Sequence, residues 1–190
     1  MAQTLVVIQG DLRPDPTARE LYLRYIKATA PLMAQHQAGV FAVGEGLTSD
    51  HTTAVFSINA VLCFKSFEHA SAFFMDPGYL EIKGRYRDPA YAQLSLSAFE
   101  LEVDRGPLEP PPHGRLSMEL LSCEPPLGGD ITREAPHLTA TGRWLPSMTA
   151  EWSRVHLWGP AQEPWSSGAP PERGEEGVRR TQWLNRSAQT

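Results

Sequence analysis

The sequence contains little cysteine, no excess of basic residues and no long apolar run. Its 190 residues include two cysteines, Cys63 and Cys123, and carry a net charge of -5. A single distant pair is not a disulfide framework, so we expect a reducing compartment and predict a cytoplasmic protein. The acidic balance argues against nucleic acid and anionic membranes as partners. The apolar runs are shorter than the roughly 20 residues that span a bilayer, and the N-terminus lacks the basic segment of a signal peptide.

Most catalytic signatures are also missing. Gly44-Glu45-Gly46 lacks the third glycine of a dinucleotide-binding loop, and neither a phosphate-binding loop nor a Gly-x-Ser-x-Gly elbow is present. The six histidines are scattered, with no i, i+4 pair and no Cys-x-x-Cys partner. We therefore predict no metal site and no cofactor.

Composition divides the chain near Asp104. All five tyrosines precede this position and all five tryptophans follow it. We predict a first domain over residues 1–105, a proline-rich linker over 106–113, and a Trp/Pro-rich extension over 114–190 that is partly disordered from about residue 166.

The first domain shows alternating strand and helix patterns. We expect strands at 5–9, 40–43, 54–64 and 93–103. Asp15 and Pro16 mark the start of a helix that runs to about His36. Ser66 caps a second helix, which stops at Asp76-Pro77-Gly78 and is followed by a short helical segment over 79–87. The order β-α-β-β-α-β predicts an α+β, ferredoxin-like domain.

The third strand has two unlike faces. One face is wholly apolar and should pack under the helices; it comprises Phe56, Ile58, Ala60, Leu62 and Phe64. The opposite face is mixed; it comprises Val55, Ser57, Asn59, Val61 and Cys63. If a second sheet covers the mixed face, hydroxyl and amide groups line the lumen. The alternative is a solvent-exposed sheet face.

Several of these features together resemble a known family. They are Tyr22 and Tyr25 in the first helix, Gly39 before the second strand, the Phe64-Lys65-Ser66 junction and the Asp76-Pro77-Gly78-Tyr79 corner, followed by Arg85 and Arg87. In this half the chain resembles the DUF1330 family of the dimeric α+β barrel superfamily. The resemblance implies a homodimer whose sheets close into a barrel. It implies little about the reaction, because fold does not determine function.

The second half is less regular. Residues 115–123, 138–144 and 154–158 are typical of strands, and five tryptophans are too many for a solvated tail. We expect either a degenerate second barrel unit or an arm of strands and loops lying on the first domain. Residues 166–177 are predicted to be disordered, and residues 177–187 to form a helix-like end.

Three residues are candidates for catalysis. His36 is a candidate general base, because histidine commonly serves as one near neutral pH, although it also suits the C-terminal end of a helix. Tyr25 can hold a substrate carbonyl, although its ring can equally fill the core. Arg87 can fork onto a carboxylate or an enolate, although a surface ion pair with Glu81 or Asp88 is the alternative.

Five further residues are candidates for substrate binding. Ser57 and Asn59 can donate to a ligand from a rigid strand. Tyr22, Tyr79 and Arg85 complete the predicted set, for the same reasons as Tyr25 and Arg87.

These residues lead to a hypothesis about function. We expect a cofactor-independent enzyme that cyclises, isomerises or oxygenates a small carbonyl or phenolic metabolite in the barrel lumen. One alternative is a non-catalytic small-molecule-binding module, and another is a dimeric interaction module without a ligand.

Overall fold

The computed structural model describes residues 3–46, 56–101, 114–121, 138–143, 152, 154–158 and 178–185. Thirteen elements follow along the chain: β1 (Thr4–Leu12), α1 (Pro16–Gln35), β2 (Ala38–Gly46), β3 (Ile58–Phe64), α2 (Phe67–Met75), α3 (Pro77–Ile82), the π-helical turn η1 (Lys83–Arg87), α4 (Asp88–Ala90), β4 (Tyr91–Leu101), β5 (Gly114–Leu121), β6 (Leu138–Arg143), β7 (Arg154–Trp158) and β8 (Val178–Asn185). No helix in this part of the chain is long and apolar enough to cross a membrane.

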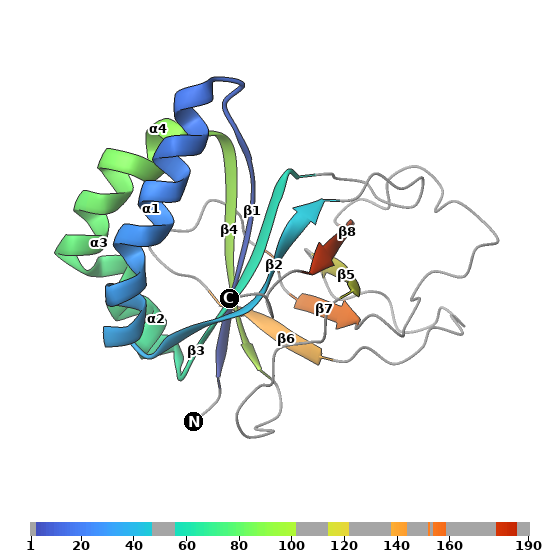
Figure 1. Ribbon diagram of the computed structural model, residues 1–190. Coiled ribbons are helices and arrows are strands. Elements are labelled where there is room, and N and C mark those ends of the chain that lie inside the picture. The colour runs from blue at the N-terminus through green and yellow to red at the C-terminus, as the bar shows by residue number, and fades with distance from the viewer. Residues whose placement is uncertain are drawn as a thin grey trace, which may run out of the picture.

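The first sheet has the ferredoxin-like strand order. β1 lies between β3 and β4, and β2 pairs with the outer side of β3, all antiparallel. The four helical segments cover one side of this sheet (Figure 1). The predicted α+β, β-α-β-β-α-β fold is therefore confirmed.

The other side of the sheet is covered by the second half of the same chain. β8 pairs with β2 and β6 pairs with β4, and the strand order β1-β3-β2-β8-β5-β7-β6-β4 forms a closed barrel (Figure 1). The resemblance implied that a second copy would close this barrel, whereas here one chain closes it. The second half thus supplies the degenerate barrel unit that was one of the two expected arrangements.

One expectation for the second half is wrong. Residues 177–187 were expected to be helix-like, but Val178–Asn185 form strand β8, which pairs with both β2 and β5. Cross-strand pairing overrides local helix propensity when a strand has partners on both sides. The predicted linker and the segment predicted to be disordered, 166–177, lie outside the described residues, and the division into domains stays a prediction.

The two main helices begin where the capping residues indicated. The Asp15 carboxylate accepts a hydrogen bond from the Thr17 backbone N–H at 2.7 Å, and Pro16 occupies the first turn of α1. Ser66 caps α2, and Asp76 caps α3 by accepting from the Gly78 backbone N–H at 2.7 Å.

Side chains alternate between the two sides of the sheet as the third strand predicted. Leu62 and Phe64 of β3 pack with the helices, together with Val6 of β1 and Leu96 of β4. The barrel interior holds a second core; it comprises Leu5, Val7, Phe41, Ala42, Val61, Phe99, Leu101, Met118, Leu120, Ala140, Val155 and Leu157. The barrel core therefore draws on strands from both halves of the chain.

Candidate functional site

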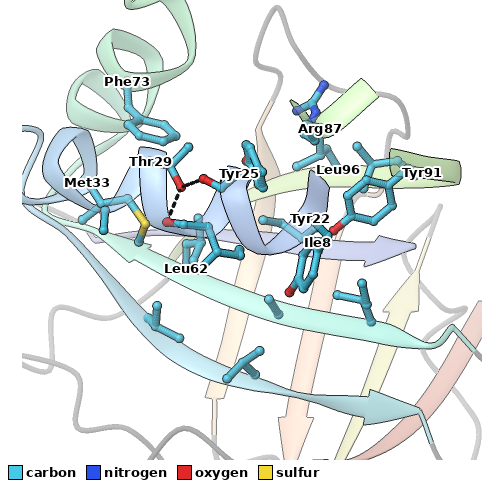
Figure 2. Close-up of a pocket in the computed structure, with 18 of the residues that line it drawn as sticks. Ile8, Tyr22, Tyr25, Thr29, Met33, Leu62, Phe73, Arg87, Tyr91 and Leu96 are labelled. Carbon is cyan, nitrogen blue, oxygen red and sulfur yellow. Dashed lines mark hydrogen bonds between the residues drawn. The ribbon is translucent and has the colours of Figure 1, made fainter. Parts of the chain in front are cut away.

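A cavity of about 420 Å³ lies between α1 and the helix-facing side of the first sheet. This volume falls within the range typical of ligand sites. Figure 2 shows Met33 and Phe73 toward one end, and Tyr22, Tyr91 and Arg87 toward the other. The lining residues are Ile8, Tyr22, Tyr25, Ile26, Thr29, Ala30, Met33, Ala34, Ala38, Val40, Val43, Ile58, Ala60, Leu62, Phe73, Arg87, Tyr91, Leu94 and Leu96.

The position of this cavity differs from the expectation. The sequence placed the site in the barrel lumen, on the mixed face of the third strand. The structure places the cavity on the opposite, apolar face of the same strand, where Ile58, Ala60 and Leu62 form part of its wall. On the barrel-facing side, an apolar core lies beside the buried, hydrogen-bonded amides of Gln9 and Asn59.

Arg87 is the charged residue among the side chains that line the cavity. It is the last residue of the π-helical turn η1 and is 5% exposed. Its Nη1 donates to the Tyr79 hydroxyl at 2.8 Å, and its Nε donates to the Asp88 carboxylate at 3.1 Å. Burial opposes the charge on Arg87, but Tyr79, Tyr25 and Asp88 outweigh it and raise the pKa of the guanidinium. The cavity therefore contains a permanent cation.

Asp88 shares its charge between two cations. Its Oδ1 lies 3.0 Å from the Arg87 Nη2, and its Oδ2 accepts from the Lys83 Nζ at 2.6 Å. The Asp88 side chain is 44% exposed, so water screens it far more than it screens Arg87. This arrangement leaves the guanidinium only partly neutralised.

Three tyrosines face the cavity from two elements. Tyr22 and Tyr25 come from α1, and Tyr91 comes from the start of β4. Burial raises the pKa of each phenol, and for Tyr25 the neighbouring Tyr79 raises it further. All three therefore remain protonated at neutral pH and can act as hydrogen-bond donors.

Gly10 makes room for Tyr91. A Cβ at position 10 would lie 2.7 Å from the Tyr91 ring and 2.8 Å from the Gln93 backbone oxygen. The ring also meets Tyr22 edge-on, with 6.0 Å between ring centroids. Sequence reasoning missed Tyr91 because it placed the start of this strand at Gln93. Gly10 inside an apolar strand was the available signal, since such a glycine often marks a close approach.

The predicted site residues separate into four groups. Tyr22, Tyr25 and Arg87 line the cavity, and Tyr79 lies directly behind them as a fully buried partner of Arg87. Arg85 is exposed and lies over the Tyr86 ring, 5.2 Å from its centroid.

Ser57 and Asn59 belong to the opposite side of the sheet. The Asn59 amide donates to the Phe56 carbonyl at 2.8 Å and accepts from Gln9 at 3.2 Å. The Ser57 backbone N–H donates to Asp11 at 2.8 Å. Neither residue lines the cavity, and their hydrogen bonds connect β3 to β1.

His36 also lies outside the cavity lining. Its Nε2 is 3.0 Å from the Asp76 Oδ2, which joins the end of α1 to the cap of α3. The hydrogen bond from His36 lowers the pKa of Asp76, assisted by the backbone N–H groups of Gly78 and Tyr79. This geometry is that of a link between helices.

Among the residues that the structure describes, those lining the cavity include no carboxylate and no histidine. Among the described residues, no group of His, Cys, Asp and Glu side chains is placed to hold a metal ion. The polar side chains among the lining residues are one cation, three protonated phenols and the Thr29 hydroxyl, which donates to the helix backbone. Such an arrangement can bind a carbonyl or phenolic oxygen and stabilise negative charge on it.

Comparison with known proteins gives a family and a fold. The family model described as "Domain of unknown function (DUF1330)" matches residues 12–97. No curated protein matches the chain.

Three solved structures illustrate the fold. A protein of unknown function from Rhodopseudomonas palustris is 18% identical with a TM-score of 0.47, covering 57% of this chain and 85% of that one. A dimeric, ferredoxin-like protein of unknown function from Bacteroides fragilis is 12% identical with a TM-score of 0.39, covering 52% and 95%. An anthrone oxidase-like protein is 11% identical with a TM-score of 0.57, covering 100% and 94%. The last similarity extends the shared fold over the whole chain.

Proposed function

Because the family model that matches residues 12–97 is described as a domain of unknown function, we propose the role of this chain from the cavity itself. The cavity under α1 binds a small carbonyl or phenolic metabolite, and the protein transforms it without a cofactor by cyclisation, isomerisation or oxygenation. The observation that supports this most directly is Arg87, a buried cation whose charge is only partly neutralised and which faces an otherwise apolar cavity.

Arg87 supplies the chemistry in this proposal. A charge-assisted hydrogen bond from a buried guanidinium favours an enolate or phenolate over its neutral form. The substrate then loses its proton to water, because the lining offers no ready base. Tyr25 and Tyr22 orient the substrate oxygen as neutral donors, and Tyr79 holds Arg87 in place.

The candidate base changes under this proposal. We expected His36 or a tyrosinate to remove the proton, but His36 pairs with Asp76 and burial raises the pKa of each lining tyrosine. We therefore propose that His36 links α1 to the cap of α3. Ser57, Asn59 and Arg85 lie outside the cavity and do not contact the substrate in this proposal.

The test measures the ionisation of a bound phenol. We expect 4-nitrophenol, followed by its visible absorbance, to titrate about 1–2 pH units lower when bound than when free, because one charged hydrogen bond contributes about 1.5–3 kcal/mol. Arg87→Gln should abolish the shift, whereas Arg85→Gln, at an exposed position, should preserve it. A bound phenol with an unshifted pKa in the wild-type protein would contradict the proposal.

A binding module without catalysis is the second candidate. The described residues of the lining favour it, because they include no carboxylate or histidine and proton transfer normally uses such a group. An Arg87-dependent phenol shift without conversion of any carbonyl or phenolic substrate, with or without oxygen, would favour the binding module over the enzyme.

We also propose a homodimer in the cytoplasm. Leu23, Ile26 and Val40 are 58%, 47% and 46% exposed, and they lie on α1 and β2 where a second copy could cover them. Light scattering of the purified protein tests this assembly, and a monomeric mass would exclude it.

A further inference from the structure

The cavity is elongated and has two chemically different ends. Its lining residues on α1 run from Tyr22 to Ala34, a distance of twelve helical rises or about 18 Å. Figure 2 shows Arg87, Tyr22 and Tyr91 toward one end, and Met33 and Phe73 toward the other. One end therefore offers hydrogen-bond donors and a charge, and the other offers an apolar wall.

The middle of the cavity offers little polarity. Thr29 is the polar residue there, and its hydroxyl donates to the backbone carbonyls of Tyr25 at 2.9 Å and Ile26 at 3.1 Å (Figure 2). Its proton is thus directed at the helix backbone. Ala60 and Leu62 of β3 lie among the lining residues of the sheet. A ligand that passes this point meets mainly hydrocarbon.

The polar end retains capacity for one anionic group. Arginine has five N–H donors. Hydrogen bonds and ion pairs in the described part of the chain use one on Nε, one on Nη1 and one on Nη2. The two that remain belong to Nη1 and Nη2, the pair of nitrogens that can fork onto a planar anion.

We infer that the ligand is an elongated amphipathic monoanion whose charged end lies at the Arg87 end of the cavity. Its carboxylate, enolate or phenolate oxygen pairs with Arg87, and its apolar body extends beneath α1 toward Met33 and Phe73. The inference rests on the proposed function, because it takes the same cavity as the binding site. It adds the charge, the shape and the orientation of the ligand. Because the described lining carries one positive charge and is otherwise mostly apolar, it should bind monoanions more tightly than cations or dianions.

Three probes of equal length test the charge. Decanoate, decanol and decylamine differ only in the head group, and calorimetric titration at pH 8 and below the micelle concentration measures each affinity. We expect decanoate to bind about 10–100-fold more tightly than decanol, as one charged hydrogen-bonded pair implies, and decylamine to bind more weakly than decanol. Arg87→Gln should remove the preference for decanoate and leave decanol nearly unchanged, and the exposed Arg85→Gln is the matched control.

A second variant tests the orientation. Ala38 lines the cavity at the start of β2, next to the Met33 end. Ala38→Leu should weaken dodecanoate at least tenfold while leaving hexanoate within about threefold, because only the longer chain reaches this end. If Ala38→Leu does not fold, Met33→Phe replaces it in the same experiment, because Met33 of α1 lines the same end of the cavity. Equal losses for the short and the long carboxylate would overturn the orientation with the charged end at Arg87.

The outcomes separate this inference from the proposed function. If 4-nitrophenol binds with an Arg87-dependent shift but decanoate binds no better than decanol, the proposed function stands and the inference fails. If neither probe responds to Arg87→Gln, both fail. If decanoate binds through Arg87 but the bound phenol keeps its ordinary pKa, the cavity selects anions and the proposed chemistry fails.

Discussion

The barrel-facing and helix-facing sides of the first sheet are packed to different degrees. On the barrel side, Leu5, Val61 and Phe99 are at most 1% exposed and belong to one core with β5, β6 and β7. On the helix side, a cavity of about 420 Å³ separates Ile8 and its neighbours from α1. Closing strands fill a sheet face with interdigitating side chains. A helix that presents threonine and alanine to a sheet leaves space, and in this protein the space adjoins a buried cation.

The largest expected difference in stability comes from truncating two residues of β1 that lie on opposite faces of the sheet. Leu5→Ala should lower the free energy of unfolding by about 3 kcal/mol, because it opens a cavity in a filled core. Ile8→Ala should cost only about 1–2 kcal/mol, because Ile8 already borders an open space. Urea denaturation of both variants measures the difference. Equal losses would mean that the helix side is packed as tightly as the barrel side.

The complementary experiment enlarges one alanine on each face of the sheet and compares the stability of the two variants. Ala140 of β6 is fully buried in the barrel core, so Ala140→Leu should overpack it and cost about 1–3 kcal/mol. Ala60 of β3 lines the cavity, so Ala60→Leu should change stability by less than about 1 kcal/mol while abolishing the binding of phenols and carboxylates. Thermal unfolding with ligand titration checks both, and an Ala60→Leu variant that still binds would place the ligand elsewhere.

The smallest effect concerns acid stability at the end of β1. Burial raises the pKa of Asp11, but hydrogen bonds from the Ser57 backbone and the Gln93 amide outweigh it and lower the pKa below the ordinary value. A lowered native pKa stabilises the fold above the unfolded pKa near 4, and this contribution is lost as the pH falls through the native pKa.

Asp11→Asn should therefore cost less than about 1 kcal/mol at pH 7, because water screens this carboxylate, and progressively less below pH 4. Urea midpoints measured across this range give the difference between the two proteins. A difference that is constant with pH would show that the charge of Asp11 does not contribute.

The sequence predicted those parts of the fold that depend on local signals. Asp15 with Pro16 indicated the start of α1, and Ser66 indicated the start of α2, because capping uses residues within one turn. The alternation in the third strand indicated which side would pack under the helices. The strands at 114–121, 138–143 and 154–158 were also indicated by their apolar pattern.

The remaining features depend on contacts between distant segments. β8 is a strand because Gly44–Gly46 and residues 114–121 pair with it, and no local pattern in 178–185 carries that information. The cavity was expected on the mixed face because polar side chains there suggested a wet lumen. Asn59 instead bonds to Gln9 of β1, and barrel closure buries Asn59 and Val61, while Ser57 precedes β3 at an exposed position and bonds to Asp11.

Arg87 shows how two alternatives from the sequence can both hold. The ion pair with Asp88 exists, and the same guanidinium also faces the cavity and donates to Tyr79. The sequence could not decide between them, because the π-helical turn η1 determines the direction of the side chain. In a regular α-helix, a residue eight positions after Tyr79 would lie about 80° around the axis from it.

Closure of the barrel within one chain has a consequence for how this protein can evolve. In a barrel made of two identical subunits, every substitution appears twice and every cavity has a symmetric copy. Here α1 and the strands β5–β8 belong to different segments of one chain, so a substitution in one segment has no copy in the other. Substitutions in α1 can therefore reshape the cavity without changing the strands β5–β8 that close the barrel. The two halves can change independently, which two identical subunits cannot do.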